Sequence, residues 1–476
     1  MHFQVGLFRG VGVCIQNLIP VRNLGSLFEF AYRGSTHWIF VRLCALVVLG
    51  MAGPLAGAAG ESGTFVVLSD IHFNPFAPKD QATSRIGEDT NQALLVSGLA
   101  TFARAMTRAD FAIVPGDLLA HRFNAKAAAS LGVDPSSPAV DDMAAQTTLV
   151  VARALAEALG GKPAIVALGN EDSICGDYKV EPGGPYLAAT REAVRNLVGA
   201  ERLDADFAKT WAATGYYAAR HPTVANGLIV VLNDVMWSPH YQDTCGSNGL
   251  AAAEAMMRWL SERLARQRAA GGRVWMVHHI PWGIDAYSTL NAKAPSCPAK
   301  VVPFLKEPFA SELRALLMEY RDVIQASFSG HTHFDDYRLL LDRSGTVVGL
   351  DKITPALSPI FGQNPGFQVF TYDRPSGAPS DFSTWHLTNP GDAAQAADWR
   401  FEYTFSEAYG QPRYAPDTVA TLWQAMMKGG AARDTYRRLY KVGRGELGTD
   451  GLAAYLCAIG HTDVTSFTAC YCGDRR

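Results

Sequence analysis

The sequence predicts an α/β protein whose polar side chains gather at one edge of a sheet. From Thr64 onward, short apolar runs rich in β-branched residues alternate with Ala- and Leu-rich stretches of helical periodicity. Five of the apolar runs lead directly into carboxylate, imidazole or amide side chains. Because the strands of an α/β sheet present their carboxyl ends at one edge, these five segments are expected to place their polar side chains in a single cleft.

The predicted elements follow in chain order. Residues 65–68 lead into Asp70 and His72, 111–114 into Asp117, 164–168 into Asn170, 274–277 into His278 and His279, and 323–328 into His331 and His333. Helices are predicted at 89–109, 141–159, 249–269 and 308–319. Strand-like alternation between turns at 337–341, 346–350 and 367–372 predicts a second sheet. We expect a surface connection at 376–397 and short helices over 398–476.

Composition excludes two broad classes of protein. The 476 residues are 48% hydrophobic and 18% charged, which is typical of a folded globular chain and excludes intrinsic disorder. The 42 basic and 45 acidic side chains give a formal net charge of −3. A chain with so little positive charge gains little from counterion release on a nucleic acid, so a nucleic-acid scaffold protein is not expected.

Residues 1–58 have the features of a leader that ends in a signal peptide. An apolar run at 43–52 follows Arg42 and precedes a small-residue stretch of A-x-A type, with cleavage expected near Ala58. A membrane anchor is the alternative, but the run is shorter than the roughly 20 apolar residues that a spanning helix needs. We therefore expect an exported protein, periplasmic or secreted, in a compartment that permits disulfides and without a stable membrane anchor.

The candidate ligands at the strand ends predict a site for two metal ions. They include carboxylate, imidazole and amide groups but no thiolate, a set that suits Zn, Fe or Mn rather than copper or an iron–sulfur cluster. Two cations about 3.5 to 4 Å apart need a bridging anion, and Asp117, on its own Gly-Asp turn, is the best candidate. Such a pair makes hydroxide from a bridging water and polarises phosphoryl oxygens, which predicts phosphoester hydrolysis.

The order of these motifs, Asp-x-His, Gly-Asp, Gly-Asn, His and Gly-His-x-His, resembles the calcineurin-like metallophosphoesterases. Residues 116–121 (GDLLAH), 279–283 (HIPWG) and 329–337 (SGHTHFDDY) look like the acid sphingomyelinase and sphingomyelinase-like phosphodiesterase branch. The resemblance implies a four-layer αββα sandwich as the catalytic domain over 64–390. It also implies a small helical C-terminal subdomain with a cysteine cluster over 391–476, and no saposin domain.

The resemblance also assigns the ligands. One metal takes Asp70, His72, Asp117 and His333, and the other takes Asp117, Asn170, His279 and His331. Zinc is favoured, with iron or manganese as alternatives. His279 is preferred to its neighbour His278 because the ligand of the family directly precedes Ile-Pro.

Two further positions are assigned catalytic roles. His121 is implied to face the substrate and protonate the departing oxygen, and its alternative is a second-layer or surface histidine. Glu171 stands where the family usually has histidine. A carboxylate beside a phosphate is repelled unless it is protonated or metal-bound, so Glu171 is expected either to act as an acid with a raised pKa or to point away.

For the cysteines, the resemblance suggests the disulfides Cys245–Cys297 and Cys457–Cys470. Cys175 and Cys472 are then left to pair with each other or to remain free.

The expected function is that of an exported, monomeric phosphodiesterase with two metal ions, which acts by attack of a metal-bridging hydroxide. Its expected substrates are soluble phosphodiesters, nucleotides or phospholipid headgroups. An acid phosphomonoesterase with the same metals is the first alternative. A metal-binding homologue without catalytic activity, suggested by Glu171, is the second.

Overall fold

The computed structural model describes residues 62–78, 82–246 and 248–473, and the predicted leader at 1–58 lies outside them. The described strands form two six-stranded sheets. The order in the first is β12 (Trp399–Thr404), β11 (Pro379–Leu387), β10 (Gly366–Asp373), β1 (Ser62–Val67), β2 (Phe111–Val114) and β3 (Ala164–Val166). The order in the second is β4 (Tyr217–Arg220), β5 (Gly227–Val231), β6 (Arg273–Val277), β7 (Ile324–Ser329), β9 (Val347–Ile353) and β8 (Asp336–Leu341).

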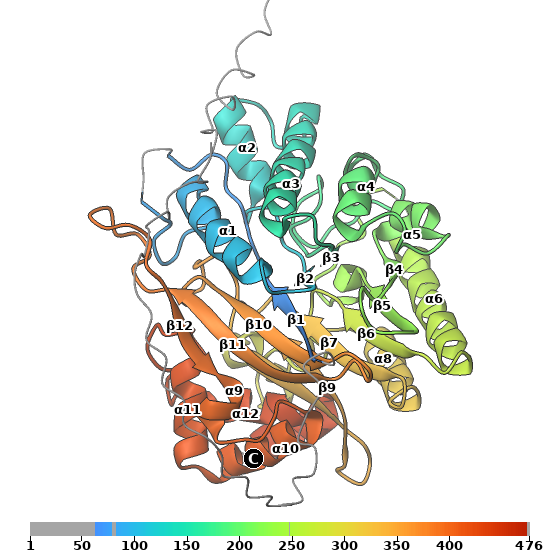
Figure 1. Cartoon of the computed structure of the whole chain (residues 1–476), viewed down its shortest axis with the longest axis vertical. Coiled ribbons are helices and arrows are strands. Elements are labelled where there is room, and N and C mark those ends of the chain that lie inside the picture. The colour runs from blue at the N-terminus through green and yellow to red at the C-terminus, as the bar shows by residue number, and fades with distance from the viewer. Residues whose placement is uncertain (1–61, 79–81, 247, 474–476) are drawn as a thin grey trace, which may run out of the picture. The chain divides into compact units, whose positions relative to one another are not determined.

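The helices cover the outer faces of both sheets, which gives the expected four layers, αββα (Figure 1). Helices α1 (Gln92–Met106) and α3 (Pro138–Leu159) pack on the first sheet, and α6 (Gly249–Ala269) and α8 (Phe309–Glu319) pack on the second. The other helices before residue 320 are α2 (Phe123–Leu131), α4 (Pro185–Val198), α5 (Phe207–Thr214) and α7 (Ala286–Asn291), with 3₁₀ turns at Asp234–Trp237 and Pro298–Lys300.

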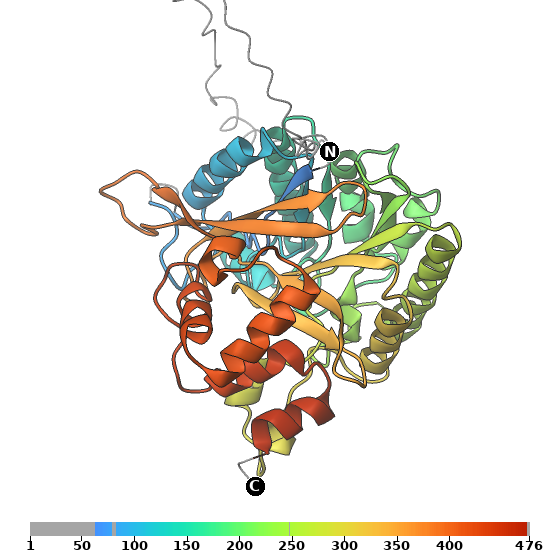
Figure 2. The same ribbon diagram turned by 60° about the horizontal axis from the view of Figure 1, so that its bottom comes forward.

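The C-terminal region is helical, as expected, and its helices gather below the sheets (Figure 2). They are α9 (Phe405–Tyr409), α10 (Pro416–Lys428), α11 (Ala431–Leu439), α12 (Leu452–Gly460) and α13 (Val464–Cys472).

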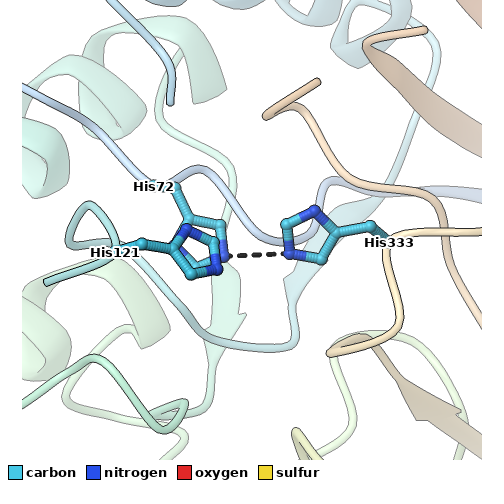
Figure 3. A group of neighbouring side chains, drawn as sticks. All are labelled: His72, His121 and His333. Atoms are coloured by element: carbon cyan, nitrogen blue, oxygen red, sulfur yellow. Dashed lines mark hydrogen bonds between the residues drawn. The ribbon is translucent and has the colours of Figure 1, made fainter. Parts of the chain in front are cut away.

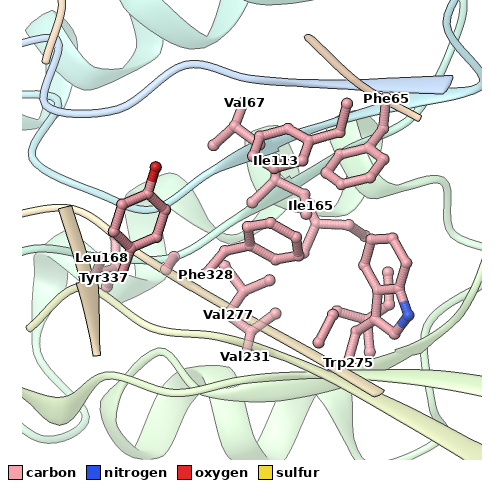
Figure 4. Packing of buried hydrophobic residues seen from close by; sticks show 14 of the residues in the cluster. Phe65, Val67, Ile113, Ile165, Leu168, Val231, Trp275, Val277, Phe328 and Tyr337 are labelled. Carbon is pink, nitrogen blue, oxygen red and sulfur yellow. The ribbon is translucent and has the colours of Figure 1, made fainter. Parts of the chain in front are cut away.

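A shared core of aromatic and aliphatic side chains fixes the two sheets face to face (Figure 4). The ring of Phe65 in β1 stacks on Phe370 of β10, with 4.9 Å between ring centroids. It also meets Trp275 of β6 edge to face at 4.9 Å and Phe328 of β7 at 5.3 Å. Strands β1, β2 and β3 are parallel to one another, as are β5, β6, β7 and β9. The packing of the core therefore holds the carboxyl ends of both parallel sets beside one site.

Two predictions for the region after residue 336 were wrong. Residues 379–387 form the half-buried strand β11 rather than a surface connection. The apolar alternation is hidden because the buried positions include polar Thr384, which accepts a hydrogen bond from Gln368. The strands over 337–372 do not form one separate sheet. β8 and β9 join the second sheet, whereas β10 pairs antiparallel with β1, a pairing between residues some 300 apart that sequence alternation does not reveal.

The disulfides are Cys175–Cys245, Cys297–Cys472 and Cys457–Cys470. The pair Cys457–Cys470, which links α12 to α13, is as predicted. The predicted pair Cys245–Cys297 was wrong, because Cys297 lies beside the end of α13, with its Cα 5.8 Å from that of Cys472. Cys245 instead lies 6.0 Å from Cys175 between Cα atoms, and the suggested pairing of Cys175 with Cys472 was wrong for the same reason.

Candidate metal centre

The polar side chains predicted from the strand ends meet at the carboxyl edge of the two sheets. Among the described residues, ten that are not glycine have a positive φ, and five of these belong to the predicted ligand set. The five are Asp70, His72, Asp117, His331 and His333, with φ between 44° and 70°. Left-handed backbone is unfavourable for such residues and is retained mainly where function requires a particular side-chain direction. The sharp turns after β1, β2 and β7 therefore aim these side chains into one place.

Asp117 lies at the centre of the cluster. Its Oδ2 is 3.4 Å from Nε2 of His72, which follows β1 of the first sheet. The same oxygen is 3.1 Å from Nε2 of His279, which follows β6 of the second sheet. Its Oδ1 accepts a hydrogen bond of 2.9 Å from the backbone N–H of Glu171. One carboxylate oxygen thus faces imidazoles from both sheets, which is the position that a bridging ligand needs.

Asp70, His72 and His333 form the first group beside Asp117. The Nε2 atoms of His72 and His333 face each other at 3.0 Å, as Figure 3 shows. Asp70 Oδ1 lies 3.5 Å from Nε2 of His333 and 3.9 Å from Nε2 of His72. All three side chains are buried.

Asn170, His279 and His331 form the second group. Asn170 Oδ1 lies 3.0 Å from Nε2 of His279 and 2.9 Å from Nδ1 of His331. The amide nitrogen of Asn170 donates to Asp177 at 2.8 Å, so the oxygen of the same amide is turned toward the two imidazoles. The two groups and Asp117 together bring all seven predicted ligands into one cluster.

The hydrogen bonds behind the histidines fix which nitrogen faces the site. Nδ1 of His72 lies 2.8 Å from the carbonyl of Leu119, and Nδ1 of His279 lies 3.0 Å from the carbonyl of Pro115. A carbonyl only accepts, so Nδ1 of each ring carries a proton and Nε2 is the nitrogen that faces the site. The two Nε2 atoms lie beside the carboxylate of Asp117, and that of His279 also lies beside the amide oxygen of Asn170. The arrangement fits two divalent cations, one on either side of Asp117, and the absence of thiolate from the seven donors agrees with that fit.

The electrostatics of the protein groups agree with a cation site. Burial lowers the pKa of His72 to about 3 and that of His331 to about 3, so both rings are neutral and able to act as ligands. Burial opposes ionisation of Asp117, but His279 and then His72 outweigh it and hold the pKa of Asp117 well below its ordinary value. Asp117 is therefore ionised, as a bridging carboxylate must be.

His121 lies over the first group, at the edge of the site. Its ring stacks on that of His72 with 3.9 Å between centroids, and Figure 3 shows the two rings together opposite His333. The side chain is 21% exposed, and its Nδ1 lies 2.8 Å from Oδ1 of Asp89. His121 thus lies where a group bound to the centre would contact it, and it is held there by a buried carboxylate.

Asp89 is a site residue that the sequence analysis missed. It lies at the start of the predicted helix 89–109, where an acidic residue is ordinary, whereas α1 begins only at Gln92. The buried carboxylate contacts both His121 and the ammonium group of Lys126. Burial opposes its charge, but the hydrogen bond from His121 and the nearby cations outweigh burial and lower the pKa of Asp89. No local sequence signal distinguishes this aspartate from a helix-capping one.

Glu171 points inward and is buried. Only 2% of the residue is exposed, Oε1 accepts from the backbone N–H of Arg122 at 3.3 Å, and Oε2 has no hydrogen-bond partner among the described residues. Burial, then Asp177 and Asp117, raise the pKa of Glu171 to about 10. The raised pKa keeps the Glu171 carboxyl group protonated, as the first of the two alternatives for this residue requires.

His278 points away from the cluster. Its Nδ1 lies 2.8 Å from the carbonyl of Ile280, and its Nε2 lies 3.0 Å from Oγ of Ser327 and 3.3 Å from Asp351. These contacts occupy both ring nitrogens beneath the sheet edge. The structure therefore places His279, and not His278, among the candidate ligands.

Tyr178 is a second residue that the sequence did not indicate. Its hydroxyl lies 3.2 Å from Nε2 of His331, on the side of that ring opposite Asn170. The backbone of Tyr178 is left-handed, with φ of 51°, and the Cys175–Cys245 disulfide closes the same loop three residues earlier. The loop therefore fixes the orientation of the His331 ring.

Comparison with known proteins places this chain beside curated phosphodiesterases. It is 25% identical over 256 residues to acid sphingomyelinase-like phosphodiesterase 3b of Homo sapiens, covering 51% of this chain and 53% of the relative. It is 27% identical over 270 residues to sphingomyelinase phosphodiesterase C of Dictyostelium discoideum, covering 53% and 55%. It is 24% identical over 261 residues to cyclic GMP-AMP phosphodiesterase SMPDL3A of Homo sapiens, covering 53% of each. The chain spans about half the length of these relatives.

Among solved structures, a dimetal phosphatase from Danio rerio aligns with 68% of this chain and 95% of its own, at 12% identity and a TM-score of 0.41. No family model matches the chain. The fold and the site define an α/β protein with the donor set of a two-metal centre. Over about half of its length the chain is similar to acid sphingomyelinase-like phosphodiesterases, the branch that its motifs resemble.

Proposed function

We propose that this chain hydrolyses phosphodiesters at a centre of two divalent metal ions. The observation that carries the proposal is the position of Asp117, whose carboxylate lies between two groups of candidate ligands. Asp70, His72 and His333 would hold one ion, and Asn170, His279 and His331 the other. When bound, two such ions lower the pKa of water and polarise phosphoryl oxygens. Zinc is the proposed metal, and iron and manganese are the alternatives that the donor set also accepts.

Different residues of the chain are proposed to have different roles in such a reaction. The two groups of ligands fix the place of the phosphate at the edge where β1, β2, β3, β6 and β7 end. His121 is proposed to give its proton to the departing oxygen, since its ring is partly exposed and lies over the first group. Asp89 orients that ring through Nδ1, so that Nε2 is the nitrogen left to act.

The proposed substrates are soluble phosphodiesters, nucleotides or phospholipid headgroups, in line with the substrates named for the relatives. The test is a hydrolysis screen of the purified chain, loaded with Zn, Mn or Fe. Its substrates are bis(p-nitrophenyl) phosphate, p-nitrophenyl phosphate, sphingomyelin and glycerophosphocholine. We expect the diester bis(p-nitrophenyl) phosphate to be turned over with a kcat/KM at least about tenfold above that of the monoester. Preference for the monoester would indicate a phosphomonoesterase, and full metal occupancy without hydrolysis would indicate a non-catalytic homologue.

Glu171 is proposed to contact the phosphate or the departing group through Oε2, the buried atom without a partner. We expect Glu171→Gln to lower kcat about 10- to 100-fold, because the amide keeps the size of the side chain but cannot act as an acid. Metal content, measured by elemental analysis, should stay unchanged, since Glu171 is not among the proposed ligands. Loss of metal from this variant would show that Glu171 is itself a ligand.

Export to the periplasm or the medium is proposed from the predicted signal peptide and the three disulfides. Within residues 62–78, 82–246 and 248–473, no helix has the length and apolar character to span a membrane. We further propose a monomer in which residues 64–390 are the catalytic domain and 391–476 the C-terminal subdomain. We do not propose that the chain binds nucleic acid as a scaffold protein.

A further inference from the structure

An exposed aromatic ring stands at the edge of the metal centre. Phe361 is 53% exposed, although it lies against two buried or half-buried imidazoles of the site. Its ring is 4.6 Å from that of His333 and 5.3 Å from that of His121, centroid to centroid, and meets both edge to face. Neither contact covers the ring. An apolar surface of this kind beside a polar site is typical of a binding surface for part of a ligand.

The turn that carries Phe361 is firmly attached to the body of the protein. The backbone N–H of Gly362 donates to the carbonyl of Pro359 at 3.2 Å, and that carbonyl also accepts from Gly87 at 3.1 Å. Gln363, which is fully buried, donates from its side chain to the carbonyl of Ser358 at 2.5 Å. Gly362 has φ of +96°, a conformation that glycine alone adopts easily, so the turn after Phe361 is sharp. The ring is thus presented at the tip of an ordered turn.

The position of the ring relative to His121 indicates which part of a substrate would reach it. If His121 protonates the departing oxygen, the group attached to the phosphate on that side extends over His121, where Phe361 is the exposed neighbour. Another aromatic ring near the centre, that of Phe304 at 5.9 Å from His331, is buried and offers no such surface. A flat aromatic base or a hydrocarbon chain would each cover the exposed face of a phenyl ring.

We propose that Phe361 is a specificity-determining residue that binds an apolar or flat aromatic group esterified to the substrate phosphate. This inference rests on the proposed phosphodiesterase function and deepens it, because it adds a recognition element outside the metal ligands. A nucleobase and a hydrocarbon chain share the required chemistry. A diester that lacks any apolar group would bind through its phosphate alone and would not use the ring.

The test compares Phe361→Ala with the unaltered chain on diesters with different apolar groups. Thymidylyl-(3′→5′)-thymidine supplies a base on its departing nucleoside, short-chain phosphatidylcholine supplies hydrocarbon, and glycerophosphocholine supplies neither. We expect Phe361→Ala to lower kcat/KM about 5- to 20-fold for one or both of the first two, mainly through KM, and by less than about twofold for glycerophosphocholine. The diester with the larger loss identifies the source of the group. Phe401→Ala is the matched control, because this ring is 47% exposed but lies on the edge strand β12.

The outcomes separate this inference from the function on which it rests. Equal losses on all three diesters, or a fall in metal content, would overturn it, because Phe361 would then act only by holding the rings of His121 and His333. Unchanged kcat/KM on all three would overturn it as well. If the unaltered chain hydrolyses none of the three diesters or bis(p-nitrophenyl) phosphate, the phosphodiesterase proposal itself fails.

Discussion

Asp117→Asn is expected to lower turnover of every phosphodiester by at least about 10³-fold and to remove metal from the protein. The backbone N–H of Glu171 requires an acceptor, and it now donates to Oδ1 of Asp117 at 2.9 Å. In the variant the amide oxygen takes that position, so the amide nitrogen replaces Oδ2 between His72 and His279. An amide NH₂ group donates hydrogen bonds and does not bridge two cations.

The measurement is elemental analysis of metal per chain, beside kcat on bis(p-nitrophenyl) phosphate. Asp434→Asn, a change of an exposed carboxylate on α11, is the control and should alter neither quantity. Unfolding followed by circular dichroism shows whether the fold survives, since the inter-sheet core around Phe65 does not involve Asp117. A folded Asp117→Asn variant that keeps two metals and full activity would contradict the bridging role.

The fold class and the candidate ligands could be predicted from the sequence because both are local properties. Each candidate ligand follows its strand within a few residues, as Asp117 follows β2 and His279 follows β6. The apolar runs that form these strands are buried on both faces, so they are continuous in sequence and easy to recognise. Because the strands are parallel, their carboxyl ends lie at one edge of the sheet, so no further sequence signal is needed to expect the ligands to lie together.

What the sequence could not predict depends on contacts between distant residues. Asp89 joins the site only because α1 starts late and leaves the carboxylate facing His121, 32 residues away. Strand β11 was missed because its buried polar residue, Thr384, is satisfied by Gln368 on the neighbouring strand. The partner of Cys297 is 175 residues away on the last helix, a distance at which spacing carries no signal.

His121→Ala is expected to lower turnover about 10²- to 10³-fold for diesters with alkyl leaving groups, but only about tenfold or less when p-nitrophenol departs. An alkoxide needs a proton as it leaves, whereas p-nitrophenolate leaves without one. Asp89→Asn should show the same dependence on the leaving group with a smaller loss, because the amide keeps a contact to Nδ1 but removes the charge that orients and stabilises the protonated ring.

Metal content decides between two roles for His121, since its ring nitrogens lie close enough to those of His72 and His333 to share a cation with them. If His121 is the acid, His121→Ala keeps its metal and the loss depends on the leaving group. If His121 is a ligand, metal falls and all diesters lose activity alike, which would contradict the acid role. His461→Ala, a change at the C-terminal end of α12, should leave metal content and all rates unchanged. The hydrogen bond from Nδ1 of His121 to the buried Asp89 leaves Nε2 to face the site in either role, so metal content and the dependence on the leaving group decide between them.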